Sequence, residues 1–375
     1  MDIKGKIVRW IKVALAGATM AIGAASCGGG GEIFLGVARF NNDSLATKFT
    51  TSILVSDVAM APAQTHSNLV NPWGIVLDPF GFAWVANNGT NSATQYDGNG
   101  APQTQVVEVL PGAAGDARPT GIVFNGTRDF RVEQNGSTSA STLIVAGEAG
   151  TLAGWSPISG ASSAVTVFDG GAGGPVYKGL AIARFAGANH LYAADFRNNA
   201  IDVFNASFAR IRTLPGRFRD PTLPGGYAPF GIQAIGERIY VAYARQAGSG
   251  PDQVAGEGLG VVNVFDTGGV FISRLVTGGA LNAPWGMAQA PVNFGTFSNA
   301  LLVGNFGDGK INAYNPVTGQ FQGTLSRTDG SPIAIDGLWG IAFGNGINFQ
   351  PANTLFFAAG PANETHGQYG RIDIQ

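Results

Sequence analysis

The sequence contains few of the residues that form disulfides or carry charge. It has one cysteine, Cys27, so no disulfide can form within the chain. Charged residues make up 12% of the 375 residues, against about 25% in an average soluble domain. Long helices need charged or Ala- and Leu-rich outer faces. This composition therefore argues against a mainly helical protein.

Residues for metal or nucleophilic chemistry are also scarce. The three histidines, His66, His190 and His366, have no zinc-type spacing such as HExxH. His190 comes just before a predicted strand, where we expect an exposed turn. No Gly-x-Ser-x-Gly segment is placed as a strand-to-helix elbow, and Cys27 has no histidine to activate it. Neither a zinc site nor a nucleophilic triad is indicated.

Nucleic-acid binding is not indicated either. The formal net charge is −2, and no three basic residues follow one another after Cys27. A surface that binds phosphates needs a clustered field of Lys and Arg. We therefore expect no nucleic-acid partner, and we expect a monomer.

The N-terminal segment has the pattern of an export signal. Basic residues up to Lys12 are followed by an uncharged run, Val13–Ala25, which is too short to span a membrane as a helix. The run ends Ala24-Ala25-Ser26-Cys27 and then four glycines, which resembles a bacterial lipobox and tether. We predict a signal peptide over 1–26 and a lipid anchor at Cys27 with a tether over 27–48.

The alternative at this segment is an ordinary signal-peptidase cut at the same bond, because Ala24 stands where a lipobox usually has Leu. An unpaired thiol is a liability in an oxidising compartment, and acylation of Cys27 would remove it. Gly28, rather than Asp, follows Cys27. We therefore expect an exported protein anchored at the outer membrane or cell surface, on the periplasmic or extracellular side.

What the chain has in abundance is glycine, 57 residues, between short apolar segments. A Gly-plus-apolar phrase occurs six times, about 50 residues apart, a spacing typical of propeller blades. The phrases are 72–75, 119–122, 177–180, 229–232, 284–287 and 338–341. Each is followed by a second apolar segment and a third strand-like segment. We predict an all-β, six-bladed β-propeller over 49–375.

The two ends of the repeat predict how the ring closes. The sixth unit ends after its third strand, while the strand-like segment 50–55 precedes the first phrase without a unit of its own. Pairing the two would complete the last blade and remove an unpaired edge. The phrase glycines would allow close backbone approach near the axis. We expect the Trp and Phe residues before them to be core.

Several phrases resemble those of NHL-type six-bladed propellers, and more specifically an uncharacterised family of exported bacterial propellers. The segments that carry the resemblance are 71–74, 177–181, 283–286, 302–309 and 336–340. The resemblance covers about 49–375 and implies the propeller fold. It implies no activity, because that family has none assigned.

The turns after the second strands should converge on one face of the ring and could line a ligand-binding mouth. Their polar residues differ from blade to blade, which leaves room for binding, although Asn and Asp in turns also have purely structural uses. The candidates are Asn87, Glu148, Asp195, Arg197, Arg245, Asn305, Asp308 and His366. We expect a glycan or protein partner, bound by a scaffold that breaks no bond.

The alternative function is a metal-dependent lactonase- or lyase-like enzyme with Ca²⁺ or Mg²⁺ near the axis. The oxygen ligands for such an ion would come from Asn87, Asp195, Asn305 and Asp308. The inner phrases offer only Asp78 and Asp336 as nearby acids, and no Glu. We therefore favour the binding function and assign no catalytic residue.

Overall fold

The computed structural model describes residues 47–375 except residue 249. The predicted signal peptide over 1–26, the lipid site at Cys27 and all but the end of the tether lie outside the described residues. In the part of the chain that is described, no helix is long and apolar enough to cross a membrane.

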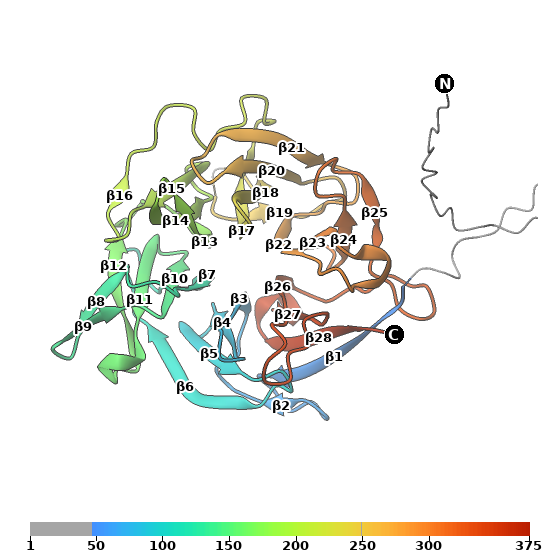
Figure 1. Cartoon of the computed structure of the whole chain (residues 1–375), viewed down its shortest axis with the longest axis horizontal. Coiled ribbons are helices and arrows are strands. Elements are labelled where there is room, and N and C mark those ends of the chain that lie inside the picture. Colours follow the sequence, from blue (N-terminus) through green and yellow to red (C-terminus); the bar gives the residue numbers. More distant parts are fainter. Residues whose placement is uncertain (1–46, 249) are drawn as a thin grey trace, which may run out of the picture. The chain divides into compact units, whose positions relative to one another are not determined.

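The described chain is built from antiparallel sets of strands arranged around a ring (Figure 1). We name each set by its inner strand. The β3 set contains β3 (Pro72–Leu77), β4 (Ala83–Asn87), β5 (Ser92–Tyr96) and β6 (Pro102–Val109). The β7 set contains β7 (Pro119–Phe124), β10 (Leu143–Gly147), β11 (Thr151–Trp155) and β12 (Ser163–Asp169). The β13 set contains β13 (Tyr177–Phe185), β14 (Ala188–Asp195), β15 (Ala200–Phe204) and β16 (Arg210–Ile211).

The remaining sets complete the ring. The β17 set contains β17 (Tyr227–Ile235), β18 (Arg238–Gln246), β20 (Val261–Asp266) and β21 (Phe271–Thr277), with β19 (Gln253–Val254) paired to β18. The β22 set contains β22 (Pro284–Gln289), β23 (Leu301–Asn305), β24 (Ile311–Tyr314) and β25 (Phe321–Thr324). The β26 set contains β26 (Leu338–Phe343), β27 (Leu355–Ala359), β28 (Gln368–Ile374), β1 (Phe49–Ser56) and β2 (Gln64–Thr65).

The inner strands form the closed ring. In the described residues, six inner strands contact one another in the order β3, β7, β13, β17, β22 and β26, and β26 contacts β3. Each phrase predicted from the sequence lies in one of these strands. The prediction of an all-β propeller is confirmed.

The predicted closure is present as the pairing of β1 with β28. The two strands run antiparallel, with Phe49 opposite Ile374 at one end and Ser56 opposite Gln368 at the other. The outer strand of the last set therefore comes from the start of the described chain, and β28 has a strand on each side.

The phrase glycines pack as the sequence predicted. A Cβ placed on Gly74 would lie 2.5 Å from the carbonyl oxygen of Thr120, and one on Gly340 would lie 2.5 Å from that of Trp73. Both of these oxygens belong to the neighbouring inner strand. A side chain at these positions would push adjacent inner strands apart.

Some features lie outside the predicted repeat. The hairpin β8 (Arg131–Gln134) and β9 (Ser137–Ala140) is inserted between β7 and β10. The outer strands β6 and β12 pair in parallel, which joins the β3 and β7 sets into one sheet. The sole described α element, α1 (Pro361–Glu364), contains left-handed residues, and short 3₁₀ turns occupy Pro157–Ser159 and Gly295–Phe297.

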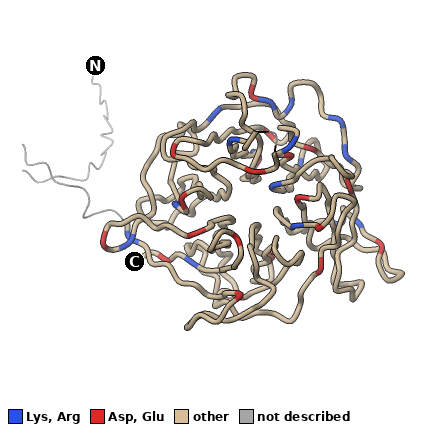
Figure 2. The backbone as a smooth tube through the Cα atoms, turned by 180° about the vertical axis from the view of Figure 1, so that it is seen from behind, with Lys and Arg blue, Asp and Glu red and all other residues tan. Residues whose placement is uncertain are grey.

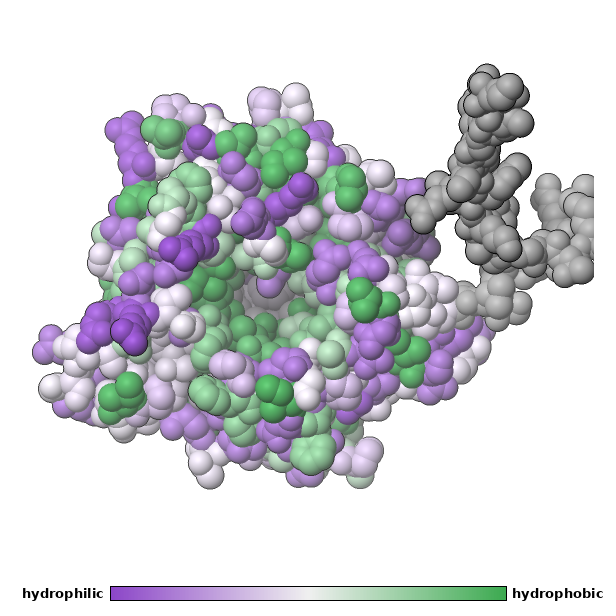
Figure 3. Space-filling model, viewed as in Figure 1, coloured by the Kyte–Doolittle hydropathy of each residue, from purple (hydrophilic) through white to green (hydrophobic). Residues whose placement is uncertain are grey.

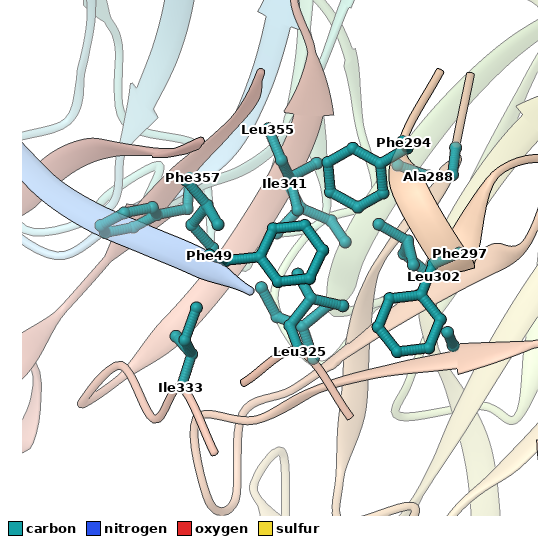
Figure 4. Packing of buried hydrophobic residues seen from close by; sticks show 14 of the residues in the cluster. Phe49, Ala288, Phe294, Phe297, Leu302, Leu325, Ile333, Ile341, Leu355 and Phe357 are labelled. Carbon is teal, nitrogen blue, oxygen red and sulfur yellow. The ribbon is translucent and has the colours of Figure 1, made fainter. Parts of the chain in front are cut away.

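The core lies between neighbouring sets. Figure 4 shows one such cluster, in which Phe49 of β1 packs against Phe294 and Phe297 of the β22 set and against Leu355 and Phe357 of the β26 set. The ring centroids of Phe49 and Phe294 are 5.0 Å apart. The closing strand is thus held by buried aromatic packing as well as by its ladder with β28.

Candidate ligand-binding mouth

The mouth face is the side of the ring where inner strands begin and second strands end. Pro72 of β3 lies opposite Asn87 of β4, and Pro284 of β22 lies opposite Asn305 of β23. The six residues just before the phrase glycines lie near the beginning of the inner strands, close to this face. Four of them are aromatic: Trp73, Phe230, Trp285 and Trp339. We refer to these four residues as the aromatic plug.

The aromatic plug fills the axis. Its residues are between 0% and 8% exposed and belong to one buried cluster. Trp73 stacks on Trp339 with ring centroids 3.5 Å apart. Trp73 also meets Phe230 edge-on at 6.5 Å, although β3 and β17 lie on opposite sides of the ring. The prediction that these residues are core is confirmed, and their contacts reach across the axis as well as between neighbouring sets.

The axis below the aromatic plug is narrow. A gap of about 30 Å³ is lined by five of the six phrase glycines and by side chains of the inner strands, far below the roughly 300–1,000 Å³ of a typical ligand pocket. Figure 3 shows hydrophobic residues gathered around the hollow at the centre of the ring. Ligand binding on the mouth face therefore has to take place above or beside the aromatic plug.

Lys178 occupies the plug position of β13, where four other strands carry an aromatic ring. Its side chain is 3% exposed, and its Nζ lies 2.5 Å from Oε1 of Glu148. The same Nζ lies 5.0 Å from the ring centroid of Trp73, a cation–π geometry. A buried ion pair of this kind is costly to desolvate unless further hydrogen bonds satisfy it.

Those further hydrogen bonds are present. Asn88 donates to Oε2 of Glu148 at 3.0 Å, and Asn71 donates to Asn88 at 3.5 Å. Trp339 of the aromatic plug donates from Nε1 to Asn71 at 3.1 Å. A polar chain thus links the charged pair to the aromatic plug through turns of the mouth face.

Glu364 lies near this pair on α1. Its backbone is left-handed, with a φ of +66°, and within the described residues its buried Oε1 has no hydrogen-bond partner. Burial raises the pKa of the Glu364 carboxyl, and the nearby Glu148 and Asp252 carboxylates raise it further against the opposing effect of Lys178. A carboxyl group with a raised pKa beside a second carboxylate is typical of functional sites, although structural networks also produce it.

A pocket of about 370 Å³ opens beside Glu148. Besides Glu148, its charged lining residues are Asp116, Arg118, Arg197 and Asp252. We name it the charged pocket. It has both signs of charge on loops from three neighbouring sets, so it can hold a ligand that carries donors and acceptors together.

Two of the predicted site residues, Glu148 and Arg197, line the charged pocket. Arg197 is exposed, and its guanidinium donates to the carbonyl oxygen of Gly174 at 2.9 Å. Glu148 is half-buried and bonded to Lys178 and Asn88. The turns that follow β10 and β14 therefore both contribute to this pocket.

Four other predicted residues, Asn87, Asp195, Asn305 and Asp308, form hydrogen bonds in the turns after their second strands. Asn87 donates to Ser92 at 3.1 Å and to Thr94 at 3.0 Å. Asp195 is buried and accepts from Asn198 at 2.6 Å and from the backbone of Val176 at 3.2 Å. Burial raises the pKa of the Asp195 carboxyl, against the effect of these hydrogen bonds. These contacts are those of turn-forming residues.

Asn305 has the same structural use in the β22 set. Its side chain donates to the carbonyl oxygen of Ala280 at 2.8 Å and to Asp308 at 3.0 Å. Asp308 also forms a salt bridge of 3.2 Å with Lys310. Both residues are thus held inside one turn.

The last two candidates lie away from the charged pocket's lining. Arg245 is exposed and still lies in β18, which continues past the expected turn and pairs with β19. The Nδ1 atom of His366 lies at hydrogen-bond distance, 2.8 Å, from Oδ2 of Asp57. His190 was expected in an exposed turn, which is wrong: it is half-buried inside β14.

The proposed divalent-ion ligands are not brought together. In residues 47–375 other than 249, no group of three His, Cys, Asp or Glu side chains is placed to hold a metal ion. Asn87 and Asp195 are bonded within separate sets, and Asn305 and Asp308 are bonded to each other. The described oxygen ligands therefore do not fit the axial metal site of the alternative function.

Sequence reasoning missed Lys178 and three charged residues of the charged pocket, Asp116, Arg118 and Asp252. A signal for Lys178 was available, because a lysine stood at a position that is aromatic in four of the six phrases and expected to be buried, and such a lysine needs a partner. Arg118 precedes β7 and Asp252 lies in a long loop after β18. Arg118 stands directly before a phrase, the position of Asn71 and Ala283 in other sets, and shares their left-handed backbone. Asp252 lies next to β19, which is an addition to the β17 set.

Comparison with known proteins agrees with the fold. No protein-family model matches the chain. A virginiamycin B lyase from Staphylococcus aureus superposes with a TM-score of 0.50 and 14% identity, covering 88% of this chain and 100% of that one. The soluble aldose sugar dehydrogenase from Escherichia coli also has a TM-score of 0.50, at 13% identity, with 88% and 100% covered. At such identities the likeness concerns the fold alone.

Closer relatives are found among the proteins of Acanthamoeba polyphaga mimivirus. "Uncharacterized protein L690" is 31% identical over 85% of this chain and 84% of its own length. "Uncharacterized protein R648" is 34% identical over 333 residues, which are 87% of this chain and 80% of that protein. The chain belongs to the family of propeller proteins that includes these two mimivirus proteins.

Proposed function

We propose that the chain is a binding protein that presents its mouth face to a partner and breaks no bond. The observation that carries the proposal is the charged pocket, where two arginines and three carboxylates line about 370 Å³ beside a buried ion pair. A mixed set of charges placed on loops by a rigid ring is typical of recognition surfaces.

The chemistry of the charged pocket favours a protein partner over a glycan. Arg118 and Arg197 can pair with carboxylates, and Asp116 and Asp252 can pair with basic side chains. Stacking on a sugar needs an exposed ring, whereas the aromatic plug is at most 8% exposed. The ligand class we propose is therefore a peptide segment of a protein that carries both signs of charge.

We propose further that the protein is exported and held on a membrane by a lipid at Cys27, as its N-terminal sequence indicates. A cysteine with two or three acyl chains would anchor the protein stably without a spanning helix. Replacing the cysteine in Cys27→Ser should move the protein from the membrane fraction to the soluble fraction. Unchanged membrane partitioning of Cys27→Ser would contradict the anchor but leave the binding function standing.

The binding function is tested with the full chain immobilised and exposed to solubilised cell-envelope proteins. We expect a specific protein to be retained, and Arg197→Gln and Asp252→Asn each to lower its retention about tenfold, the effect of losing a charged hydrogen bond. Arg128→Gln is the matched control, because Arg128 is exposed in the loop after the end of β7, on the face opposite the mouth.

Three results would overturn the proposal or a part of it. Retention that is equal in all variants would remove the charged pocket as the site. Retention of glycans alone, with loss in the same variants, would keep the site but change the ligand class. A thermal melt that shifts on addition of EDTA would favour the metal-dependent enzyme instead.

A further inference from the structure

A second pocket lies on the opposite side of the ring, between the β13 and β17 sets. It has a volume of about 180 Å³ and is walled by Phe185, His190, Tyr192 and Phe218. Phe185 is the last residue of β13, so this pocket opens away from the mouth face. We name it the arginine pocket, because Arg212 and Arg217 complete its lining.

The aromatic walls of the arginine pocket are fixed by contacts between the two sets. Tyr192 donates its hydroxyl to the carbonyl oxygen of Thr267 at 2.7 Å, and the backbone of Phe218 donates to Gly269 at 2.7 Å. The rings of Tyr192 and Phe218 have centroids 5.5 Å apart. Phe185 lies over the same turn, where a Cβ on Gly268 would lie 2.5 Å from its ring. The walls are therefore formed before any ligand arrives.

The rim of this pocket has more positive than negative charge. Arg210 is paired with Asp202 at 3.2 Å, and Asp220 is paired with Arg274 at 2.7 Å. Within the described chain, neither Arg212 nor Arg217 has a carboxylate within salt-bridge distance. Figure 2 shows several basic segments along the loop that follows β16. The excess is local, since the whole chain has a formal net charge of −2.

Apolar surface lies beside these arginines. Leu214 is 68% exposed and Phe185 is 41% exposed, and both line the arginine pocket. Large apolar side chains next to unpaired guanidinium groups suit a ligand with an apolar body and an anionic end. A cavity of roughly 150 Å³ is enough to bind benzene in an engineered protein, so the volume suits one aromatic ring.

We propose that the arginine pocket binds a small aromatic carboxylate. The ring of the ligand packs against the exposed side chains of Phe185 and Leu214, and its carboxylate accepts hydrogen bonds from Arg212 and Arg217. This site is independent of the charged pocket, because the two share no lining residue and open on opposite faces.

The test is a calorimetric titration of the full chain with phenylacetate and, in parallel, with its uncharged analogue phenylacetamide. We expect saturable binding of phenylacetate and at least tenfold weaker binding of phenylacetamide. Arg212→Gln and Arg217→Gln should each weaken phenylacetate binding about tenfold. Arg219→Gln is the matched control, because Arg219 lies in the same loop but lines a different pocket.

Phe185→Ala provides a second arm, since it removes part of the wall without touching the charge. It should weaken phenylacetate and phenylacetamide by the same factor. Thermal melts verify that each variant is folded. Equal binding of the two ligands, no saturable binding of phenylacetate, or an effect of Arg219→Gln as large as that of Arg217→Gln would overturn the proposal.

Discussion

Gly231 fits its position because glycine has no side chain. A Cβ at this position would overlap the backbone carbonyl of Trp285 on the neighbouring inner strand. Backbone atoms of two paired sets cannot move aside as the end of a side chain can. Gly74, Gly121, Gly286 and Gly340 meet the backbone of the next inner strand in the same way, and Gly179 does so less closely, which explains the repeat of glycine without a catalytic role.

Gly231→Ala is therefore expected to lower the free energy of unfolding by about 3 kcal/mol, the upper range for overpacking, as measured by denaturant titration. Gly225→Ala is the control, because a Cβ there would have no atom within 4 Å, and it should change stability by less than about 0.5 kcal/mol. Equal stability of the two variants would contradict the axial packing role.

Glu364 is the second residue with a measurable signature. Because its pKa is raised by burial and by Glu148 and Asp252, the native state holds the proton more tightly than the unfolded state does. Stability is therefore full below the ordinary carboxyl pKa of about 4.3 and is lost as the pH rises through the higher native pKa.

Glu364→Gln should remove this loss of stability at higher pH, because the amide does not ionise. At pH 7 we expect the variant to be more stable than the natural chain by about 1 kcal/mol, or roughly 2 °C in Tm for a chain of this size. At pH 4 the difference should be small. Thermal melts at both pH values check the prediction, and a variant that is destabilised at pH 7 would show that ionised Glu364 is favoured by Lys178.

At the scale of elements, the closing strand β1 is the feature that the sequence predicted best. Two gaps at the ends of the repeat pointed to the same pairing, and the ladder between β1 and β28 is present. The inner strands and the second strands could also be predicted from the sequence, because their pattern of apolar and polar residues and the turns between them recur in each unit.

Other elements could not be predicted from such patterns. The β8–β9 hairpin is polar and has no counterpart in the other sets. The parallel pair of β6 and β12 involves only Ser163 and Ala164 against Glu108 and Val109, which is too short to leave a pattern. Of the charged residues that line the charged pocket, Glu148 and Arg197 were among the predicted candidates, whereas Asp116, Arg118 and Asp252 were not, because side chains meet there across sets of different loop length.

Phe49→Ala tests how strongly β1 closes the ring. Phe49 is 1% exposed in the cluster between the β22 and β26 sets, and Phe-to-Ala changes in a core cost about 3–5 kcal/mol. Phe80→Ala is the control, since Phe80 is 69% exposed. Denaturant midpoints with equal shifts for the two variants would show that β1 is held by its ladder alone.

At the scale of the whole molecule, the aromatic plug connects parts of the ring that share no ladder. Trp339 contacts Trp73 and Trp285 on its two neighbouring inner strands and also contacts Phe230. The sequence predicted these residues as core from their place in the phrase. It could not show that they meet across the axis, because that contact depends on the diameter of the closed ring.

Trp339→Ala should thus destabilise the ring as a unit, by about 3–5 kcal/mol, with tryptophan fluorescence and far-ultraviolet circular dichroism giving the same midpoint. Ile158→Ala is the control, because Ile158 is 76% exposed. If fluorescence and circular dichroism gave different midpoints for Trp339→Ala, the sets would unfold independently once the aromatic plug is disrupted.

The ladder between β1 and β28 also has a mechanical consequence. Phe49 and Ile374 are opposite each other, so the chain enters and leaves the ring at the same end of one strand pair. Tension applied between the two termini would pull on a single pair of hydrogen-bonded residues at a time, instead of loading the whole ladder at once. Under such a force β1 and β28 would separate one residue pair at a time, and the ring would open between these two strands before any inner strand bears the force.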